Sequence, residues 1–210
     1  MTPQQLAAKV ARPRVADERE AEILDAAVRV LADVGYDRLT MDLVAAEAHA
    51  SKATLYRHWS TKAELVVDAI SRAKGLPEEP PDTGSLRGDL MATWCDHHNS
   101  HASLPVSVMS GLMTAMHADE ELATVFRERF LEPRWSAWIT VAERARGRGE
   151  IAEGVDLDFV LALLPALCSY FGVVRGHHLD QGFVERLIDD VVFPVAQHTP
   201  TKRGSGDATS

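Results

Sequence analysis

The residues best suited to chemistry lie between Ser51 and Ala63, a stretch that contains basic side chains and no acidic one. Lysine and arginine donate hydrogen bonds to phosphates and to guanine edges, and small side chains let a helix approach base edges closely. A tyrosine hydroxyl also reaches a phosphate, and a lysine that opens a helix stands beside a positive helix terminus. The pattern therefore predicts contact with duplex DNA. The candidate contact residues are Ser51, Lys52, Ala53, Thr54, Tyr56, Arg57, His58 and Lys62.

Two short helices separated by a break at His49 are expected to position these side chains. Thr40 is a good N-cap for a helix over residues 41–48, and Ser51 can cap a second over residues 51–59. The apolar residues able to wedge the two together are Leu43, Val44, Ala48, Leu55 and Trp59. These proportions are typical of a helix-turn-helix, whose second helix enters the major groove. The alternative is an ordinary helical hairpin with solvated basic residues.

Helices are also expected on both sides of this pair. Periodic apolar residues predict a helix over residues 18–35, with Gly35 as its stop. Thr61 and Glu64 match the S/T-x-x-E capping box and open a helix over residues 62–74. The two helices complete a compact unit around the helix-turn-helix.

Residues 19–70 resemble the N-terminal domain of the TetR (tetracycline-repressor-like) transcriptional regulators. The resemblance rests on T-x-x-x-(V/L)-A-x-x-A followed by S-K-A-T-L-Y-R-H-W-S-T-K-A-E-L, and it covers about a quarter of the chain. It implies that Thr40, Lys52, Thr54, Tyr56, His58 and Lys62 occupy DNA-contacting or DNA-facing positions. His49 stands where the family usually has the turn glycine, and Met41 replaces a frequent serine or threonine. DTGSLRGDL followed by ADEELATVFRERFLEPR resembles one subgroup of the family's regulatory domains.

Charge and composition fit this interpretation. The net charge of −9 belongs to the second part of the chain, because residues 1–75 hold eleven basic and eleven acidic side chains. Only the local field at a docking surface decides whether DNA can bind there. Two cysteines 73 positions apart form no disulfide framework or CxxC site. With no uninterrupted apolar run of about 18 residues and no signal-peptide pattern, we expect a reduced cytoplasmic protein.

The chain should be all-α, with an N-terminal helix-turn-helix domain and a larger helical domain for ligand binding and dimerisation. We expect a flexible arm over residues 1–16, the DNA-binding domain over 17–74 and a proline-rich linker over 75–84. The regulatory domain should span 85–198, with helices near 85–101, 105–117, 119–131, 133–148, 156–177 and 182–196. Residues 199–210 are small and polar and are expected to be a disordered tail.

The last two of these helices are apolar on nearly all sides, which predicts that a second subunit covers them. The interface candidates are Leu161, Leu164, Cys168, Leu187 and Val191. The alternative is burial within their own domain. The family resemblance implies a four-helix bundle between two copies, and twofold symmetry implies a palindromic operator.

Methionine and aromatic side chains at helical spacing are candidates for a ligand pocket, because they adapt to and stack on apolar molecules. They are Met109, Met113, Met116, Trp135, Trp138, Tyr170 and Phe171. Simple core packing is the alternative. No basic cluster accompanies them, so the expected ligand is small and largely apolar.

The segment CDHHNSH holds the one cluster of potential metal ligands, Cys95, His97, His98 and His101. Zinc needs three or four well-placed ligands, and no second group at matching spacing supplies the rest. We interpret it as a polar helix end, His117, His177 and His178 as surface residues, and expect no metal and no cofactor.

Three functions remain open. The first is a ligand-responsive DNA-binding repressor, and the second is a helical adaptor for protein partners. The third is an enzyme, which we do not expect, because the sequence has no nucleophile–base pattern, GxSxG, P-loop or HExxH.

Overall fold

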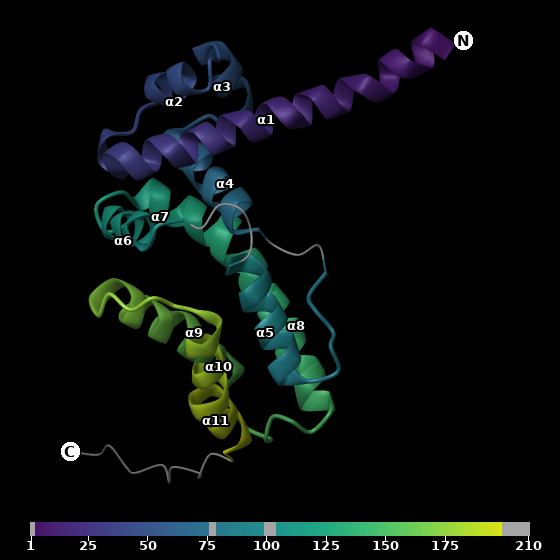
Figure 1. Ribbon diagram of the computed structural model, residues 1–210, viewed down its shortest axis with the longest axis vertical. Helices are drawn as coiled ribbons and strands as arrows, with labels where there is room; N and C mark the ends of the chain where they lie inside the picture. The colour runs from purple at the N-terminus through teal and green to yellow at the C-terminus, as the bar shows by residue number, and fades with distance from the viewer. Residues whose placement is uncertain (1–2, 76–78, 99–103, 199–210) are drawn as a thin grey trace, which may run out of the picture. The chain divides into compact units, whose positions relative to one another are not determined.

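The computed structural model describes residues 3–75, 79–98 and 104–198, and within these ranges all regular structure is helical. The described elements form two compact units. The first contains α1 to α4, α6, α7 and a π-helical turn η1; the second contains α5, most of α8, and α9 to α11 (Figure 1). The predicted all-α class is confirmed.

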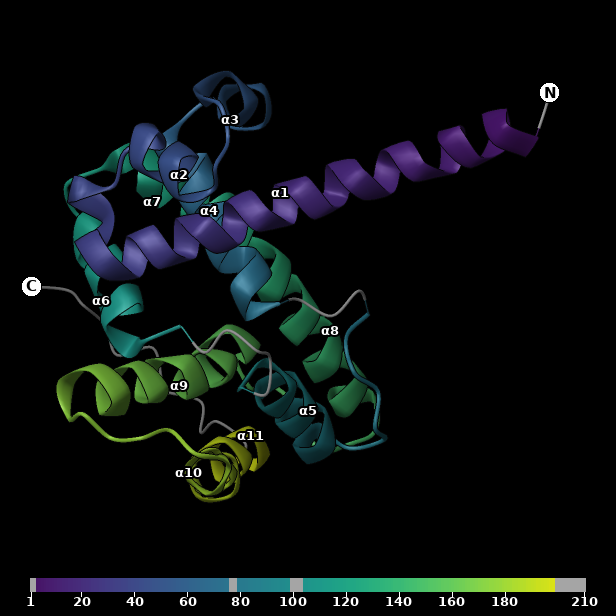
Figure 2. The same cartoon turned by 45° about the horizontal axis from the view of Figure 1, so that its top comes forward.

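The first unit is built on α1 (Pro3–Arg38) and α4 (Lys62–Lys74), which cross and pack together. α2 (Met41–Glu47) and α3 (Lys52–His58) lie side by side at one end of this pair (Figures 1 and 2). α6 (Val106–Ala115) packs on α1, and α7 (Glu120–Phe126) packs on α4. Their shared core includes Ile23, Leu55, Trp59, Leu65, Ile70, Leu112 and Leu122. Thus α6 and α7, which the sequence placed in the regulatory domain, pack with the N-terminal helices.

α1 begins well before the point that the sequence indicated. It starts at Pro3, so residues 3–16 are helical, where a flexible arm was expected. The residue types explain the difference: glutamine, alanine, leucine, lysine and arginine all favour helices, and proline is tolerated at the first helical position. The predicted stop is confirmed, because Gly35 has φ 76° and ψ 167° and interrupts the helix.

Prolines shape the later helices. η1 (Arg127–Leu131) joins α7 to α8 (Glu132–Gly147), and Pro133 follows directly in the first turn of α8. A proline inside a helix lacks the N–H of the usual bond and crowds the preceding turn. The chain responds by widening: the backbone N–H of Glu132 donates to the carbonyl of Arg127, five residues back.

The second unit contains α5 (Leu86–His98), α8 and α9 (Leu157–Ser169), which continues through the π turn η2 (Tyr170–Val174). α10 (Gln181–Leu187), the π turn η3 (Ile188–Val192) and α11 (Phe193–Gln197) follow. The shared core includes Leu86, Leu90, Val141, Ala142, Val160, Leu164 and Ile188.

Leu157–Val174 is a helix of 18 residues that is apolar and long enough to cross a membrane by length and composition alone. This differs from the expectation, because Pro165, Ser169 and Gly172 interrupt the apolar run without interrupting the helix. Core helices of soluble proteins pass the same test, and the inner side of this helix does pack in the core of its unit.

The segment that leads into α5 is fastened to the second unit. Asp89 is fully buried and accepts hydrogen bonds from the backbone N–H and the hydroxyl of Thr83 and from Arg148. Gly84 has φ +88°, and a Cβ at Gly88 would lie 2.1 Å from the Thr83 hydroxyl oxygen. Both positions therefore require glycine, which accounts for the glycines of the DTGSLRGDL motif.

The turn between α2 and α3 is a Schellman motif. The backbone N–H of Ala50 donates to the carbonyl of Ala45 at 2.8 Å, and that of His49 donates to Ala46 at 3.2 Å. His49 has φ 48°, in the left-handed region of backbone conformations that favours glycine. Arg19 of α1 donates to the carbonyl oxygens of Ala48 and His49 and so holds the turn against α1.

His49→Gly should raise the free energy of unfolding by about 0.5–1 kcal/mol, because glycine adopts positive φ without the steric cost of a Cβ. His49→Val should lower it by about 1–2 kcal/mol, since a β-branched residue fits this conformation worst. Urea unfolding of the two variants beside the wild type measures both changes. If both variants were as stable as the wild type, the turn would not impose this conformation.

Candidate nucleic-acid interface

Three capped helices form the framework of the candidate site. The hydroxyl oxygens of Thr40, Ser51 and Thr61 accept the backbone N–H groups of Leu43, Thr54 and Glu64 at 3.2, 3.1 and 3.3 Å. All three predicted caps are confirmed. The Glu64 carboxylate completes the capping box one residue early, on the backbone N–H of Ser60 at 2.7 Å.

The apolar wedge between α2 and α3 is largely as predicted. Val44, Ala48, Leu55 and Trp59 are buried. Leu43 is the exception, because it is 44% exposed and lies on the outer side of α2. The indole N–H of Trp59 donates to Asp68 Oδ2 at 2.9 Å, so its burial leaves no unpaired donor.

The predicted contact residues share the outer surface of α3, which we call the recognition face. Its members are Ser51, Lys52, Ala53, Thr54, Tyr56, Arg57 and His58, of which only Thr54 is half-buried. Thr40 is exposed at the start of α2. The structure therefore brings small, hydroxyl and basic side chains together on one short helix at a protein surface.

Acidic residues from other helices flank the recognition face. Lys52 Nζ lies 2.9 Å from an oxygen of Asp42, and the hydrogen bond to Asp42 raises the pKa of Lys52. His58 Nδ1 lies 3.6 Å from Glu20. The stretch from Ser51 to Ala63 contains no acidic residue, but the surface around it does, because α1 and α2 contribute Glu20 and Asp42. Exposed ion pairs contribute little to stability, so a phosphate can replace Asp42 as the partner of Lys52.

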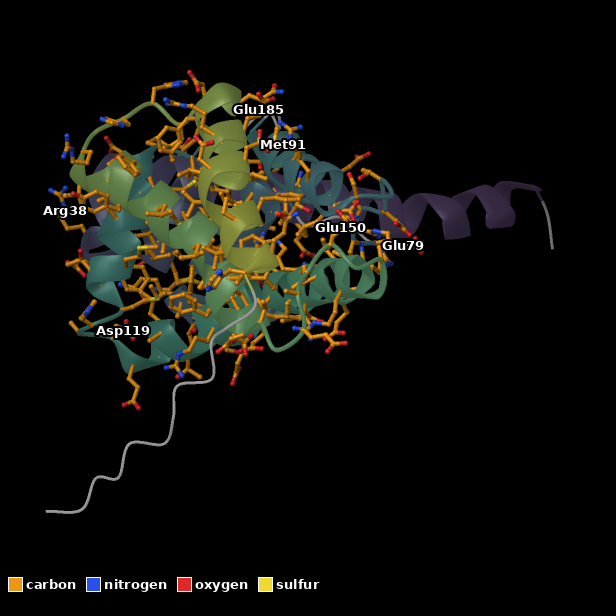
Figure 3. The ribbon with its side chains drawn as sticks, turned by 90° about the horizontal axis from the view of Figure 1, so that it is seen from below. Arg38, Glu79, Met91, Asp119, Glu150 and Glu185 are labelled. Atoms are coloured by element: carbon orange, nitrogen blue, oxygen red, sulfur yellow. The ribbon has the colours of Figure 1, made fainter. Side chains whose placement is uncertain are left out.

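The side chain of Lys62 is half-buried, whereas a lysine that binds phosphate at a protein surface is usually exposed. Its Nζ donates to the carbonyl oxygen of Tyr36 at 3.1 Å and lies 4.0 Å from the centroid of the Tyr36 ring. The Tyr36 hydroxyl in turn donates to Asp119, labelled in Figure 3, at 2.9 Å. Burial is the largest cause that raises the pKa of Tyr36, and the hydrogen bond to Asp119 is the next. The pKa of Asp119 is lowered, mainly by the hydrogen bond that it accepts from the backbone N–H of Leu122. No local sequence pattern indicates this network, because Tyr36, Lys62 and Asp119 lie far apart along the chain.

The expected pocket residues divide between the two units. Met109 on α6 and Met116 at its C-cap pack partly buried against the core of the first unit, and Met113 is exposed. Trp135 and Trp138 on α8 are half-buried, with ring centroids 5.9 Å apart. Tyr170 is exposed, and Phe171 packs edge-on against Phe183. A common pocket for these side chains remains a prediction.

The interface candidates need correction. Leu161, Leu164, Cys168 and Leu187 are buried in the core of their own unit, and only Val191 is half-buried. Burial raises the pKa of the Cys168 thiol to about 11, as expected for a core cysteine. The prediction selected residues from the side of the helix that faces its own core. A helix that is apolar on all sides does not reveal from its sequence which side that is.

The exposed side of the same helix is apolar as well. Phe159 is 64% exposed and Val174 68% exposed, and Tyr170 and Val173 are exposed between them. Their spacing places them on one side of α9 and η2, which we call the outer apolar face. Large exposed apolar surfaces mark interaction sites.

The potential metal cluster Cys95, His97, His98 and His101 lies outside the residues whose side chains the structure describes. Among the described side chains, no group of three or more histidine, cysteine, aspartate or glutamate residues is arranged to hold a metal ion.

Comparison with known proteins finds matches over most of the chain. Residues 23–69 match the family model "Bacterial regulatory proteins, tetR family", and residues 80–191 match "Tetracyclin repressor-like, C-terminal domain". The chain is 39% identical to the DNA-binding transcriptional repressor TetR of Mycobacteroides abscessus, over 84% of this chain and 93% of that protein. It is 29% identical to the regulator AqdR of Rhodococcus erythropolis, over 81% and 82% of the two chains. The crystal structure of the TetR family regulator SCO0332 aligns with a TM-score of 0.62 at 27% identity, covering 83% of this chain and 97% of that one.

Lys62→Ala should weaken binding to all duplex DNA and reduce the salt slope by about 0.9, as expected for the loss of one phosphate contact. Lys62→Arg should keep the slope, because it keeps the charge. Lys52→Ala, at a position expected to face base edges, should change the preferred sequence instead. Fluorescence anisotropy over a range of salt concentrations separates these effects. A changed preference with an unchanged slope in Lys62→Ala would show that Lys62 is not a phosphate ligand.

Proposed function

Because the chain belongs to the TetR family of helix-turn-helix transcriptional regulators, we propose that it is a homodimeric repressor of a palindromic operator. A small, largely apolar effector releases it from the DNA. The observation that carries this proposal is the recognition face, a capped helix with small, hydroxyl and basic side chains on its outer surface. The protein acts in the cytoplasm, with DNA, a second copy of itself and the effector as partners.

The recognition face has the chemistry of a major-groove reader. Ala53 and Thr54 are small enough for close approach to base edges, and Lys52 and Arg57 supply donors for guanine or phosphate. Tyr56, Lys62 and Thr40 stand where contacts to the phosphate backbone fix the position of the helix. The carboxylates of Asp42 and Glu20 repel the DNA backbone. They therefore disfavour non-specific DNA binding unless Lys52 and His58 exchange these carboxylates for phosphates.

Dimerisation supplies the second recognition helix. The outer apolar face of α9 and η2 is the support for this step, because it leaves Phe159, Tyr170, Val173 and Val174 in contact with solvent in a single chain. A twofold dimer buries the same face of both copies and presents two recognition helices to two half-sites. The half-sites are then inverted repeats about 34 Å apart along one side of the duplex.

The effector site belongs to the regulatory part of the chain. Half-buried Trp135 and Trp138 on α8 offer apolar surfaces, which favour a largely apolar molecule. Effector binding that changes the separation of the two recognition helices prevents their simultaneous docking. Thermodynamic linkage requires that operator DNA weaken effector binding by the same factor. Equal effector affinities with and without operator, in titrations followed by tryptophan fluorescence, would contradict this switch.

Selection from a library of random duplexes tests the function directly. The wild-type protein should enrich a palindrome whose half-site centres are about 10 base pairs, or a multiple, apart. Thr54→Val should enrich a different sequence in the same symmetric arrangement, since it changes one groove-facing group. Enrichment of no sequence by the wild type would overturn the proposal that the protein is a sequence-specific regulator.

Phe159→Glu and Val174→Glu should convert the dimer into folded monomers and weaken operator binding. Both positions are exposed in the single chain, so the charge costs little there, whereas burial of an unpaired charge in the dimer costs several kcal/mol. Ser136→Glu, exposed on α8, is the matched control and should remain dimeric. Analytical ultracentrifugation gives the masses, and a wild type that is monomeric at micromolar concentration would refute the dimer.

A further inference from the structure

Two carboxylates of α4 hold the end of the recognition helix. Glu64 and Asp68 are four residues apart and therefore lie on the same side of α4. Glu64 Oε2 accepts the backbone N–H of Ser60 at 2.7 Å, and Asp68 Oδ2 accepts the indole N–H of Trp59 at 2.9 Å. Trp59 is the C-cap of α3, and its backbone N–H donates to the carbonyl of Leu55. The position of the last turn of the recognition helix is thus fixed from α4.

The same two carboxylates share a third partner, Arg129 of η1. One guanidinium nitrogen of Arg129 bonds Glu64 Oε1, and the other lies 3.3 Å from Asp68 Oδ2. The site is partly shielded, because the side chain of Glu64 is 20% exposed and that of Asp68 is 32% exposed. Two carboxylates at this spacing repel each other, and the guanidinium compensates both charges.

We propose that Arg129 is a positioning residue for sequence-specific DNA binding, although it lies outside the helix-turn-helix. By bridging Glu64 and Asp68, it keeps Glu64 Oε2 aimed at Ser60 and holds Asp68 Oδ2, the atom that also accepts the Trp59 indole N–H, in place; it thereby sets the orientation of α3. The inference rests on the proposed DNA-binding function. It assigns a determinant of operator affinity to η1, the segment that joins α7 to α8 and packs on α4.

The π turn of η1 determines where this guanidinium lies. A π turn holds one more residue per turn than an α-helix and therefore rotates the side chains that it carries relative to the preceding helix. The bond from the Glu132 N–H to the Arg127 carbonyl marks the widened turn, and it directly precedes Pro133, which has no N–H to continue the α-helical hydrogen bonds. The placement of Arg129 against α4 is accordingly a local consequence of the sequence around Pro133.

Loss of an ordinary ion pair would lower only the stability of the protein. Loss of this network should lower the specificity of DNA binding. Without Arg129, Trp59 and Ser60 keep their acceptors but lose the fixed geometry, so the alignment of α3 loosens while the core stays intact. Sequence-specific binding depends on that alignment, whereas binding to arbitrary duplex depends on the number of phosphate contacts. Arg129 therefore affects the ratio of the two affinities and leaves the salt slope unchanged.

The test compares Arg129→Gln with Arg127→Gln, which removes the same charge from an exposed position of the same turn. Affinities are measured for the duplex that the wild type selects and for calf-thymus DNA over a range of salt concentrations. Arg129→Gln should lower the ratio of specific to non-specific affinity about tenfold, within the range of coupling through positioning residues, with no change in slope. Arg127→Gln should keep the wild-type ratio, and Arg129→Lys should restore part of it.

A spectroscopic measurement tests the geometry without DNA. The indole N–H resonance of Trp59, assigned by its loss in Trp59→Phe, should shift in Arg129→Gln and stay in place in Arg127→Gln. Asp68→Asn keeps an acceptor for the indole but loses the charge that holds Arg129, and it should reproduce both effects if Arg129→Gln folds poorly.

An unchanged affinity ratio and an unchanged indole resonance in both Arg129→Gln and Asp68→Asn would overturn the inference. So would an equal loss of specificity in Arg127→Gln, because the effect would then come from net charge. If the wild type selects no duplex, the proposed function fails, and the indole resonance alone decides whether Arg129 positions Trp59.

Discussion

The recognition helix has only seven residues, and this shortness is the constraint on which the rest of the structure depends. An isolated helix below about 12–15 residues is not stable in water, so α3 has to take its order from its surroundings. Ser51 caps its start, Leu55 is buried in its middle, and Trp59 ends it with a fully enclosed indole. The hydrogen bond from that indole to Asp68 joins the helix to α4. A surface that reads DNA can be rigid here only because its reverse side belongs to the core.

α4 meets this requirement because it is buried on most sides and polar on one. Its apolar residues form the centre of the first unit, while Glu64 and Asp68 line the side that faces the end of α3 and Arg129. At its other end, Arg134 donates to the carbonyl oxygens of Ser71 and Gly75. α4 is therefore held along its length by residues from η1 and the start of α8. Any displacement of these segments must either carry α4 along or break several hydrogen bonds.

Local signals made most of the site predictable, and non-local contacts account for what was missed. The caps at Thr40, Ser51 and Thr61 follow from residues within three positions of each other, so the sequence alone located the helices and their outer surfaces. Asp42 beside Lys52, and the burial of Leu164, depend on how separate helices pack. An apolar pattern on every side of a helix shows that the helix is covered, but it does not assign one side to the core and the other to a partner. The packing of α6 on α1 and of α7 on α4 likewise depends on contacts between helices that are far apart along the chain.

Hydrogen–deuterium exchange on the selected duplex tests most directly whether the recognition face binds DNA. Addition of the duplex should slow amide exchange at the start of α2, along α3 and at the start of α4, and an unrelated duplex at raised salt should leave these amides unchanged. This result would place DNA on the surface formed by Thr40, residues 51–58 and Lys62. Slowed exchange confined to other helices, with α3 as exposed as in the free protein, would contradict the account.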